Sequence, residues 1–122
     1  MYCGTDIIEV QRVQKAIESL GQTFVDKIFT KEEIEYCISK KEMQYQHFAA
    51  RFAAKEAIFK AISPLLKDKY DITWKDAQIC NDNQGRPYVE LLNKKFDKIK
   101  QIDISISHVK EYAIATCIIE LK

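Results

Sequence analysis

A predicted helix near the middle of the chain contains several residues that could do chemistry. It contains Arg51, Lys55, Glu56 and Lys60. At ~100° per residue, Glu56 falls about 40° from Phe52, on the apolar stripe of this helix, and the two lysines flank it. A carboxylate on an apolar face must be paired, hydrogen-bonded or metal-bound. Two interpretations stay open: a structural glutamate held by a lysine, or a metal ligand or general base, with the lysines and Arg51 supplying positive charge for phosphate oxygens.

Asp6 is a second candidate, because it ends a predicted strand and precedes a predicted helix. It could cap that helix or lie on the surface as an ordinary acid. It could also bind a metal, since Mg²⁺ needs only one or two protein carboxylates when phosphates and water complete its octahedron. His108 is a single histidine in a predicted turn, so it is either a surface residue or a catalytic one. We assign no role to His47.

Helices dominate the first half of the predicted structure. A short strand over residues 2–8 precedes a helix with apolar residues every three or four positions, namely Val10, Val13, Ile17 and Leu20. Gly21 follows where a left-handed C-terminal cap is expected. Thr30 and Glu33 form a capping box, and Phe29 can pack on Ile34. Ile34, Cys37 and Ile38 give that helix a buried stripe. A longer helix spans residues 45–62 and stops at Ser63-Pro64.

Strands dominate the second half. Residues 77–80 and 88–92 flank a turn-rich segment and predict a hairpin. Residues 93–100 are predicted as a short helix. Isoleucines 102, 104 and 106 alternate with polar residues, which predicts a half-buried strand. Residues 112–121 are apolar on both faces, which predicts a central strand. The pattern predicts an α+β fold with an antiparallel sheet, in a single domain over residues 1–122.

Composition narrows the class of protein. The 122 residues are 47% hydrophobic and 30% charged, and no apolar run approaches the roughly 20 residues that span a bilayer. A net charge of +1 argues against a nucleic-acid binder, and the locally clustered basic residues suit a small anionic ligand. The four scattered cysteines form no C-x-x-C pair. We therefore expect buried free thiols and a cytoplasmic protein without a membrane partner.

Three segments together resemble the holo-[acyl-carrier-protein] synthases, which are 4'-phosphopantetheinyl transferases. Residues 4–12 read GTDIIEVQR and are similar to the opening motif of that family, G-x-D-[IL]-x-x-x-x-R. Residues 51–57 read RFAAKEA, and residues 60–61 continue this central helix motif. SISH over 105–108, followed by YAIA over 112–115, is similar to the C-terminal motif. The likeness covers almost the whole chain, in the same order and at a similar length.

The resemblance implies a phosphopantetheinyl transferase fold, assembled as a trimer with active sites between subunits. It implies that Asp6 and Glu56 hold Mg²⁺, with Glu56 and Lys60 catalytic. The coenzyme A site would be lined by a set of four residues, Arg51, Lys60, Pro87 and His108. Arg12, which lies opposite the apolar stripe of the first helix, would contact the acyl carrier protein. The reaction would transfer phosphopantetheine from coenzyme A to a carrier serine and release adenosine 3',5'-bisphosphate.

Two alternatives remain beside the transferase. The family often has a Gly-Thr-Gly-like turn after the central helix, where this chain has Ser63-Pro64-Leu65. That departure leaves open a binding module that holds coenzyme A or a carrier protein without turnover. A purely structural domain, with Glu56 paired to a lysine, is the third hypothesis. The binding module would tolerate Glu56→Gln, whereas the enzyme would lose transfer.

Overall fold

The computed structural model describes residues 1–68 and 71–122, which fold into an α+β arrangement of strands and helices. The helices are α1 (Val10–Leu20), α2 (Gln22–Ile28), α3 (Lys31–Ser39) and α4 (Gln44–Ile62). Short 3₁₀ turns are η1 (Lys41–Met43), η2 (Ser63–Leu65), η4 (Trp74–Asp76) and η5 (Lys94–Phe96). The strands are β1 (Tyr2–Glu9), β2 (Ala77–Asn81), β3 (Pro87–Leu91), β4 (Ile99–His108) and β5 (Tyr112–Leu121).

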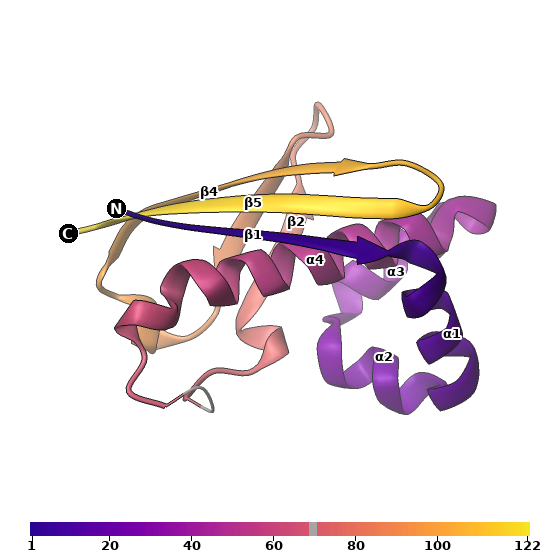
Figure 1. Cartoon of the computed structure of the whole chain (residues 1–122), viewed down its shortest axis with the longest axis horizontal. Coiled ribbons are helices and arrows are strands. Elements are labelled where there is room, and N and C mark those ends of the chain that lie inside the picture. Colours follow the sequence, from indigo (N-terminus) through magenta and orange to yellow (C-terminus); the bar gives the residue numbers. More distant parts are fainter. Residues whose placement is uncertain (69–70) are drawn as a thin grey trace.

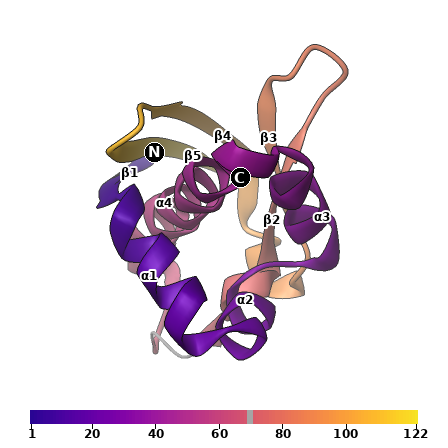
Figure 2. The ribbon, with the colours of Figure 1, turned by 90° about the vertical axis from the view of Figure 1, so that its right-hand side faces the viewer.

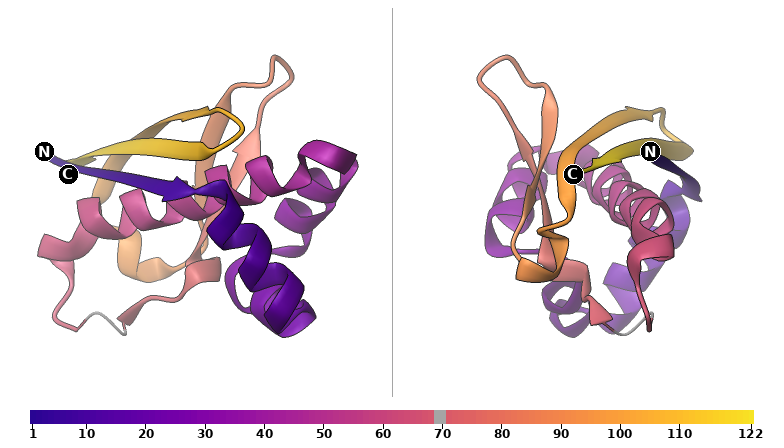
Figure 3. Two further views of the ribbon diagram at one scale, coloured as in Figure 1. Left: turned by 45° about the vertical axis from the view of Figure 1, so that its right-hand side comes forward. Right: turned by 90° about the vertical axis from the view of Figure 1, so that its left-hand side faces the viewer.

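A three-stranded antiparallel sheet in the order β1-β5-β4 lies along α4 (Figure 1). β5 is its central strand, as its two apolar faces predicted. Seen from the end, α4 lies beneath the sheet, and α1, α2 and α3 gather around its first half (Figure 2). β2 and β3 pair separately as the predicted hairpin, whose turn projects away from the rest of the molecule (Figure 3).

Helix α4 is buried on several sides. Its alanines, which are Ala49, Ala50, Ala53, Ala54, Ala57 and Ala61, are nearly inaccessible to solvent. The predicted apolar stripe that includes Phe52 is therefore only part of the buried surface of α4. Phe48 packs on Phe29, with ring centroids 5.0 Å apart, and Phe52 and Phe59 pack on Trp74 at 5.2 and 5.0 Å. The small residues let the sheet approach the helix closely.

Gly4 shows how close this approach is. A Cβ atom at Gly4 would lie 2.0 Å from the carbonyl oxygen of Ala57 and 2.7 Å from the amide nitrogen of Ala61. Only glycine fits there, because any side chain would push β1 away from α4. The glycine of the opening motif thus brings β1 against the C-terminal half of α4.

The first half departs from prediction at its boundaries. Gly21 has a positive φ of 67°, but its ψ of −149° is not that of a left-handed helical cap. The chain turns there directly into α2, which the sequence pattern did not predict. Leu20 and Ile38 were expected on buried stripes, yet both are largely exposed. The capping box of α3 is confirmed: Thr30 Oγ1 accepts from the amide of Glu33, and Glu33 Oε1 accepts from the amide of Thr30.

In the second half, the predicted helix over residues 93–100 was wrong. Only η5 forms, and β4 already begins at Ile99, which pairs with Leu121. His108 is the last residue of β4, paired with Ala113, and does not lie in the turn. The four cysteines are free, but only Cys37 and Cys117 are buried; burial is the main cause that raises the pKa of each thiol to about 12. Among the described residues, no helix is long and apolar enough to cross a bilayer.

Candidate functional site

Asp6 and Glu56 line one cavity between β1 and α4. Asp6 lies inside β1, opposite Ala115 of β5, and belongs to the set of alternate residues that face α4. The cavity measures about 440 Å³ and is lined by Asp6, Ile7, Ile8, Glu9, Arg12, Phe52, Glu56, Lys60 and Tyr112. The prediction of a strand-end position for Asp6 was wrong, and so was its alternative as a helix cap, because Glu9 takes the N-cap position of α1. We call this cavity the carboxylate site.

Charge in the carboxylate site is unevenly balanced. The Nζ of Lys60 donates to Asp6 Oδ1 at 3.1 Å and to the carbonyl oxygen of Thr5 at 3.0 Å. Burial raises the pKa of the Glu56 carboxyl, and the nearby Asp6 raises it further, while Lys60 opposes both. One lysine therefore faces two carboxylates. Cations such as a metal ion would relieve the remaining repulsion.

The residues of the carboxylate site fit Mg²⁺. Within residues 1–68 and 71–122, no three His, Cys, Asp or Glu side chains gather into a ligand cage. Mg²⁺ does not require such a cage, because it usually keeps several waters and binds one or two carboxylates together with substrate phosphates. Asp6 and Glu56 supply oxygen donors of that kind, and Glu56 carries the electrostatic cost of being near a like charge.

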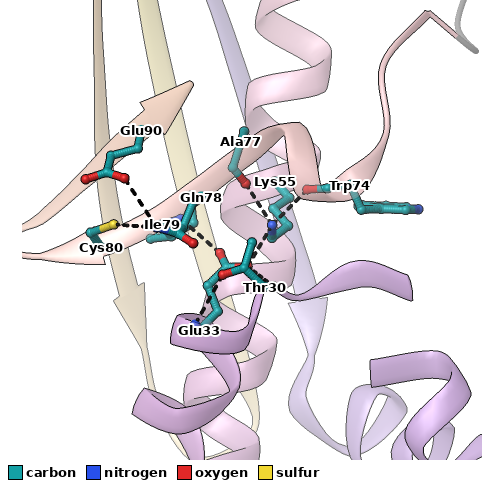
Figure 4. A network of polar contacts seen from close by, with 9 residues as sticks. All are labelled: Thr30, Glu33, Lys55, Trp74, Ala77, Gln78, Ile79, Cys80 and Glu90. Atoms are coloured by element: carbon teal, nitrogen blue, oxygen red, sulfur yellow. Dashed lines mark hydrogen bonds and ion pairs between the residues drawn. The ribbon is translucent and has the colours of Figure 1, made fainter. Parts of the chain in front are cut away.

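Lys55 does not take part in the carboxylate site. Its side chain is fully buried and pairs with the equally buried Glu33 at 2.9 Å (Figure 4). Its Nζ also donates to the carbonyl oxygens of Trp74 and Ala77, both at 2.8 Å. The prediction that Lys55 supplies charge to phosphate was wrong, because none of its surface reaches solvent. The glutamate held by this lysine is Glu33, so the structural interpretation of Glu56 loses that partner.

A second group of residues surrounds Arg51, on the side of α4 that faces the hairpin. Arg51 is only 4% exposed, and its Nη2 donates to Asn81 Oδ1 at 2.6 Å. Its guanidinium carbon lies 4.0 Å from the centre of the Tyr36 ring, close enough for a cation–π contact. Among the described residues, its buried Nε has no hydrogen-bond partner. A cavity of about 440 Å³ borders Arg51, Tyr36, Asn81 and Gly85. We call this cavity the arginine site.

His108 lies close to the arginine site through His47. The two imidazole rings are 5.0 Å apart, and His108 Nδ1 lies 3.0 Å from Gln46 Oε1. Burial, followed by His108, Lys40 and Arg51, lowers the pKa of His47 to about 4. The sequence predicted no role for His47, although it lies between His108 and the Tyr36 ring of the arginine site. Its spacing of four residues from Arg51 was the available signal, because such residues share one face of a helix.

The remaining predicted residues lie elsewhere. Pro87 borders a third cavity, of about 340 Å³, with Ser105, Thr116 and Ile118. Arg12 is exposed on α1 and lines the carboxylate site. A single chain therefore brings Asp6, Glu56, Lys60 and Arg12 together. It does not bring Arg51, Lys60, Pro87 and His108 into one cavity.

Comparison with known proteins gives a consistent result. Residues 2–117 match the family model of the 4'-phosphopantetheinyl transferase superfamily. A holo-[acyl-carrier-protein] synthase from Ruminiclostridium cellulolyticum is 44% identical over 99% of this chain and 92% of its own length. One from Protochlamydia amoebophila is 45% identical over 92% of this chain and 91% of its own length.

Solved structures agree with the sequence relatives. The Helicobacter pylori holo-[acyl-carrier-protein] synthase in complex with coenzyme A superimposes with a TM-score of 0.83, at 26% identity over 97% of this chain and 99% of that one. The Bacillus anthracis enzyme, in complex with coenzyme A (3',5'-ADP), gives a TM-score of 0.82 at 30% identity, over 99% and 96% of the two chains. The match in sequence and fold spans nearly the whole molecule, so this chain belongs to the holo-[acyl-carrier-protein] synthases of the 4'-phosphopantetheinyl transferase superfamily.

Proposed function

We propose that this protein transfers the 4'-phosphopantetheine arm of coenzyme A to a serine of an apo acyl carrier protein. The observation that carries the proposal is the carboxylate site, where Asp6 and Glu56 meet Lys60 in one open cavity. Its carboxylates suit a divalent cation, and its lysine suits a phosphate. The relatives named as holo-[acyl-carrier-protein] synthases, and the coenzyme A bound to two of the similar structures, support the substrate pair.

The chemistry follows from the charges in the carboxylate site. The serine Oγ forms a bond to the β-phosphorus of coenzyme A, and the bond from that phosphorus to the departing adenosine 3',5'-bisphosphate breaks. Mg²⁺, when bound by Asp6 and Glu56, supplies charge neutralisation on the diphosphate oxygens. Glu56, or a water that it orients, takes the proton from the serine hydroxyl; its raised pKa makes it a better base than an ordinary glutamate.

Lys60 supplies positive charge on the leaving side of the reaction. Its side chain is 54% exposed, so its ammonium can reach a bound phosphate as well as Asp6. A phosphoryl transfer depends mainly on positioning and electrostatic stabilisation, so an exposed lysine next to the carboxylates suits it. Arg51 and His108 would bind other anionic groups of coenzyme A, since the buried Nε of Arg51 still lacks a partner among the described residues.

We also infer a homotrimer with shared active sites. The face of the sheet turned away from α4 carries Ile7, Ile114 and Ile118, which are 63%, 40% and 44% exposed. Exposed apolar clusters of this kind mark contact surfaces. The carboxylate site borders this face through Ile7 and Tyr112, and the Pro87 cavity borders it through Ile118. A neighbouring subunit on this face would bring the separate groups of coenzyme A residues together.

The partner and the compartment complete the proposal. Arg12 lies exposed beside the carboxylate site, where an acidic segment of the carrier protein could pair with it and present its serine. Free thiols at all four cysteines suit the reducing cytoplasm.

The test is a transfer assay. Purified protein is incubated with apo carrier protein, coenzyme A and Mg²⁺, and the carrier is weighed by mass spectrometry, beside a control enzyme of the family. We expect the carrier to gain one phosphopantetheine group, and to gain none when Mg²⁺ is chelated. If coenzyme A binds but the carrier mass stays unchanged while the control enzyme works, the protein is a binding module and the proposed reaction is wrong.

A further inference from the structure

A buried ion pair, Glu33 with Lys55, lies against the edge of β2 that faces away from β3. Glu33 Oε2 accepts from the amide of Ile79 at 2.9 Å, and Lys55 Nζ donates to the carbonyl oxygen of Ala77 at 2.8 Å (Figure 4). Amides and carbonyls of residues two apart in a strand point to the same edge. β2 pairs with β3 along its other edge. The Glu33–Lys55 pair therefore takes the place that a further strand would have beside β2.

This pair is almost completely satisfied by hydrogen bonds. Glu33 Oε1 also accepts from the amide of Thr30 at 2.8 Å, and Lys55 Nζ also donates to the carbonyl oxygen of Trp74 at 2.8 Å. Both side chains are 0% exposed. Burial of two charges is expensive, and a buried ion pair gives little net stability compared with apolar residues of the same size. A role in fixing geometry explains the pair better than a role in raising stability.

The geometry that the pair fixes leads to the arginine site. Glu33 belongs to α3 and Lys55 to α4, so together they attach β2 to both helices. Two residues after Ile79, Asn81 accepts from Arg51 and donates to the carbonyl oxygen of Gly85 at 3.0 Å. The position of β2 thus sets where Asn81 meets Arg51. It also sets where the hairpin turn lines the arginine site.

We propose that Glu33 and Lys55 are positioning residues that hold the β2–β3 hairpin in register on α3 and α4, and thereby orient Arg51 for an anionic group of coenzyme A. This inference rests on the proposed function. The pair does not touch the carboxylate site: Lys55 and Glu56 are adjacent in sequence, but their side chains project to different sides of α4. Disturbing the pair should weaken the binding of coenzyme A and leave the binding of a divalent cation intact.

The experiment compares Glu33→Gln and the double variant Glu33→Gln/Lys55→Met with the wild type. The double variant removes both buried charges, so it should fold even if the single variant, which leaves a lysine unpaired, does not. We expect the amide of Ile79 to exchange with solvent about tenfold faster or more, because it loses a charged acceptor. The KM for coenzyme A and the Kd for adenosine 3',5'-bisphosphate should rise by about tenfold or more, while kcat changes less.

Mn²⁺ affinity and a matched control make the test specific. Mn²⁺ binding should stay at the wild-type value, because the carboxylate site is unchanged. Lys100→Met breaks an exposed ion pair with Glu120, 3.7 Å long, and should change none of these quantities. The proposal is wrong if a folded variant keeps both the wild-type exchange rate of the Ile79 amide and the wild-type affinities for coenzyme A and adenosine 3',5'-bisphosphate. It is also wrong if Mn²⁺ binding weakens as much as coenzyme A binding does. If the wild type neither binds nor uses coenzyme A, the statement about Arg51 and coenzyme A fails together with the proposed function. The exchange rate of the Ile79 amide then decides by itself whether the pair positions the hairpin.

Discussion

Two carboxylates in the carboxylate site have different surroundings, although they share one cavity. Lys60 binds Asp6 directly, whereas Glu56 has no such bond within residues 1–68 and 71–122, and its pKa is raised by burial and by Asp6. Lys60 therefore holds the Asp6 carboxylate in place. The Glu56 carboxylate binds a proton more readily than an ordinary glutamate, and a cation would stabilise it. That difference supports our proposal that Glu56 accepts the proton.

Replacing Glu56 by glutamine tests this assignment. Glu56→Gln keeps the size of the side chain but removes both the negative charge and the basic oxygen. We expect the transfer rate to fall on the order of 10²-fold or more, with the fold unchanged. Carrier mass against time measures the rate, and circular dichroism checks the fold. Glu35→Gln, on the exposed face of α3, is the matched control and should keep full activity. Full activity of Glu56→Gln would refute the role.

His47 gives a prediction about pH and stability. Its pKa in the folded protein is lowered from 6.5 to about 4, so the unfolded chain binds more protons than the folded one between these values. The free energy of unfolding should therefore fall as the pH drops from 6.5 towards 4. Urea unfolding at several pH values measures it. His47→Phe keeps the ring but cannot titrate, so its free energy of unfolding should fall less over that range; an identical pH dependence in both proteins would contradict the prediction.

At the scale of elements, β1 and α4 position the carboxylate site, and Gly4 makes their contact possible. Gly4→Ala would place a Cβ atom 2.0 Å from the carbonyl oxygen of Ala57, so β1 must move. We expect a loss of about 3 kcal/mol in the free energy of unfolding, by the usual cost of overpacking, and weaker cation binding as Asp6 shifts. Urea unfolding checks the first. Gly21→Ala meets no atom within 4 Å, but at φ 67° and ψ −149° it should cost about 1–3 kcal/mol through backbone strain and leave cation binding unchanged. Cation binding that is equally weak in both variants, or unchanged in Gly4→Ala, would show that the close approach at Gly4 does not position Asp6.

Local signals in the sequence predicted the elements that depend on local bonds. The capping box at Thr30 and Glu33 fixed the start of α3, and the two apolar faces of residues 112–121 placed β5 in the centre of the sheet. The pairing of Glu33 with Lys55 could not be predicted in this way. The two residues are 22 positions apart, and their partner amide and carbonyl come from a strand still further along the chain.

The candidate site was predictable only in part for a similar reason. Spacing on a helix marked Glu56 as costly to bury, but only the resemblance to the synthases connected it with Asp6, fifty residues earlier. The same helix pattern misassigned Lys55, because helical spacing does not tell which face meets the sheet and which meets the hairpin. The sequence predicted no role for His47, because its neighbour His108 comes from β4, and strand pairing is not visible in helix spacing.

At the scale of the whole molecule, the uncovered face of the sheet predicts assembly. Ile118→Lys places a charge on this face, and we expect it to turn the proposed trimer into monomers and to reduce transfer, because the coenzyme A residues would no longer meet. Sedimentation analysis measures the mass of the assembly. Ile38→Lys changes an isoleucine of α3 that is even more exposed than Ile118, and it should leave both the proposed trimer and the activity intact. A wild-type protein that sediments as a monomer with full activity would refute the shared site.

The central claim is that Asp6 and Glu56 bind one divalent cation together with coenzyme A. Electron paramagnetic resonance with Mn²⁺, in the presence of saturating coenzyme A, measures that binding directly. We predict a single bound ion per chain in the wild type, and a loss of affinity of at least about tenfold in both Asp6→Asn and Glu56→Gln. Wild-type Mn²⁺ affinity in either variant would contradict the account, because the ion would then bind elsewhere.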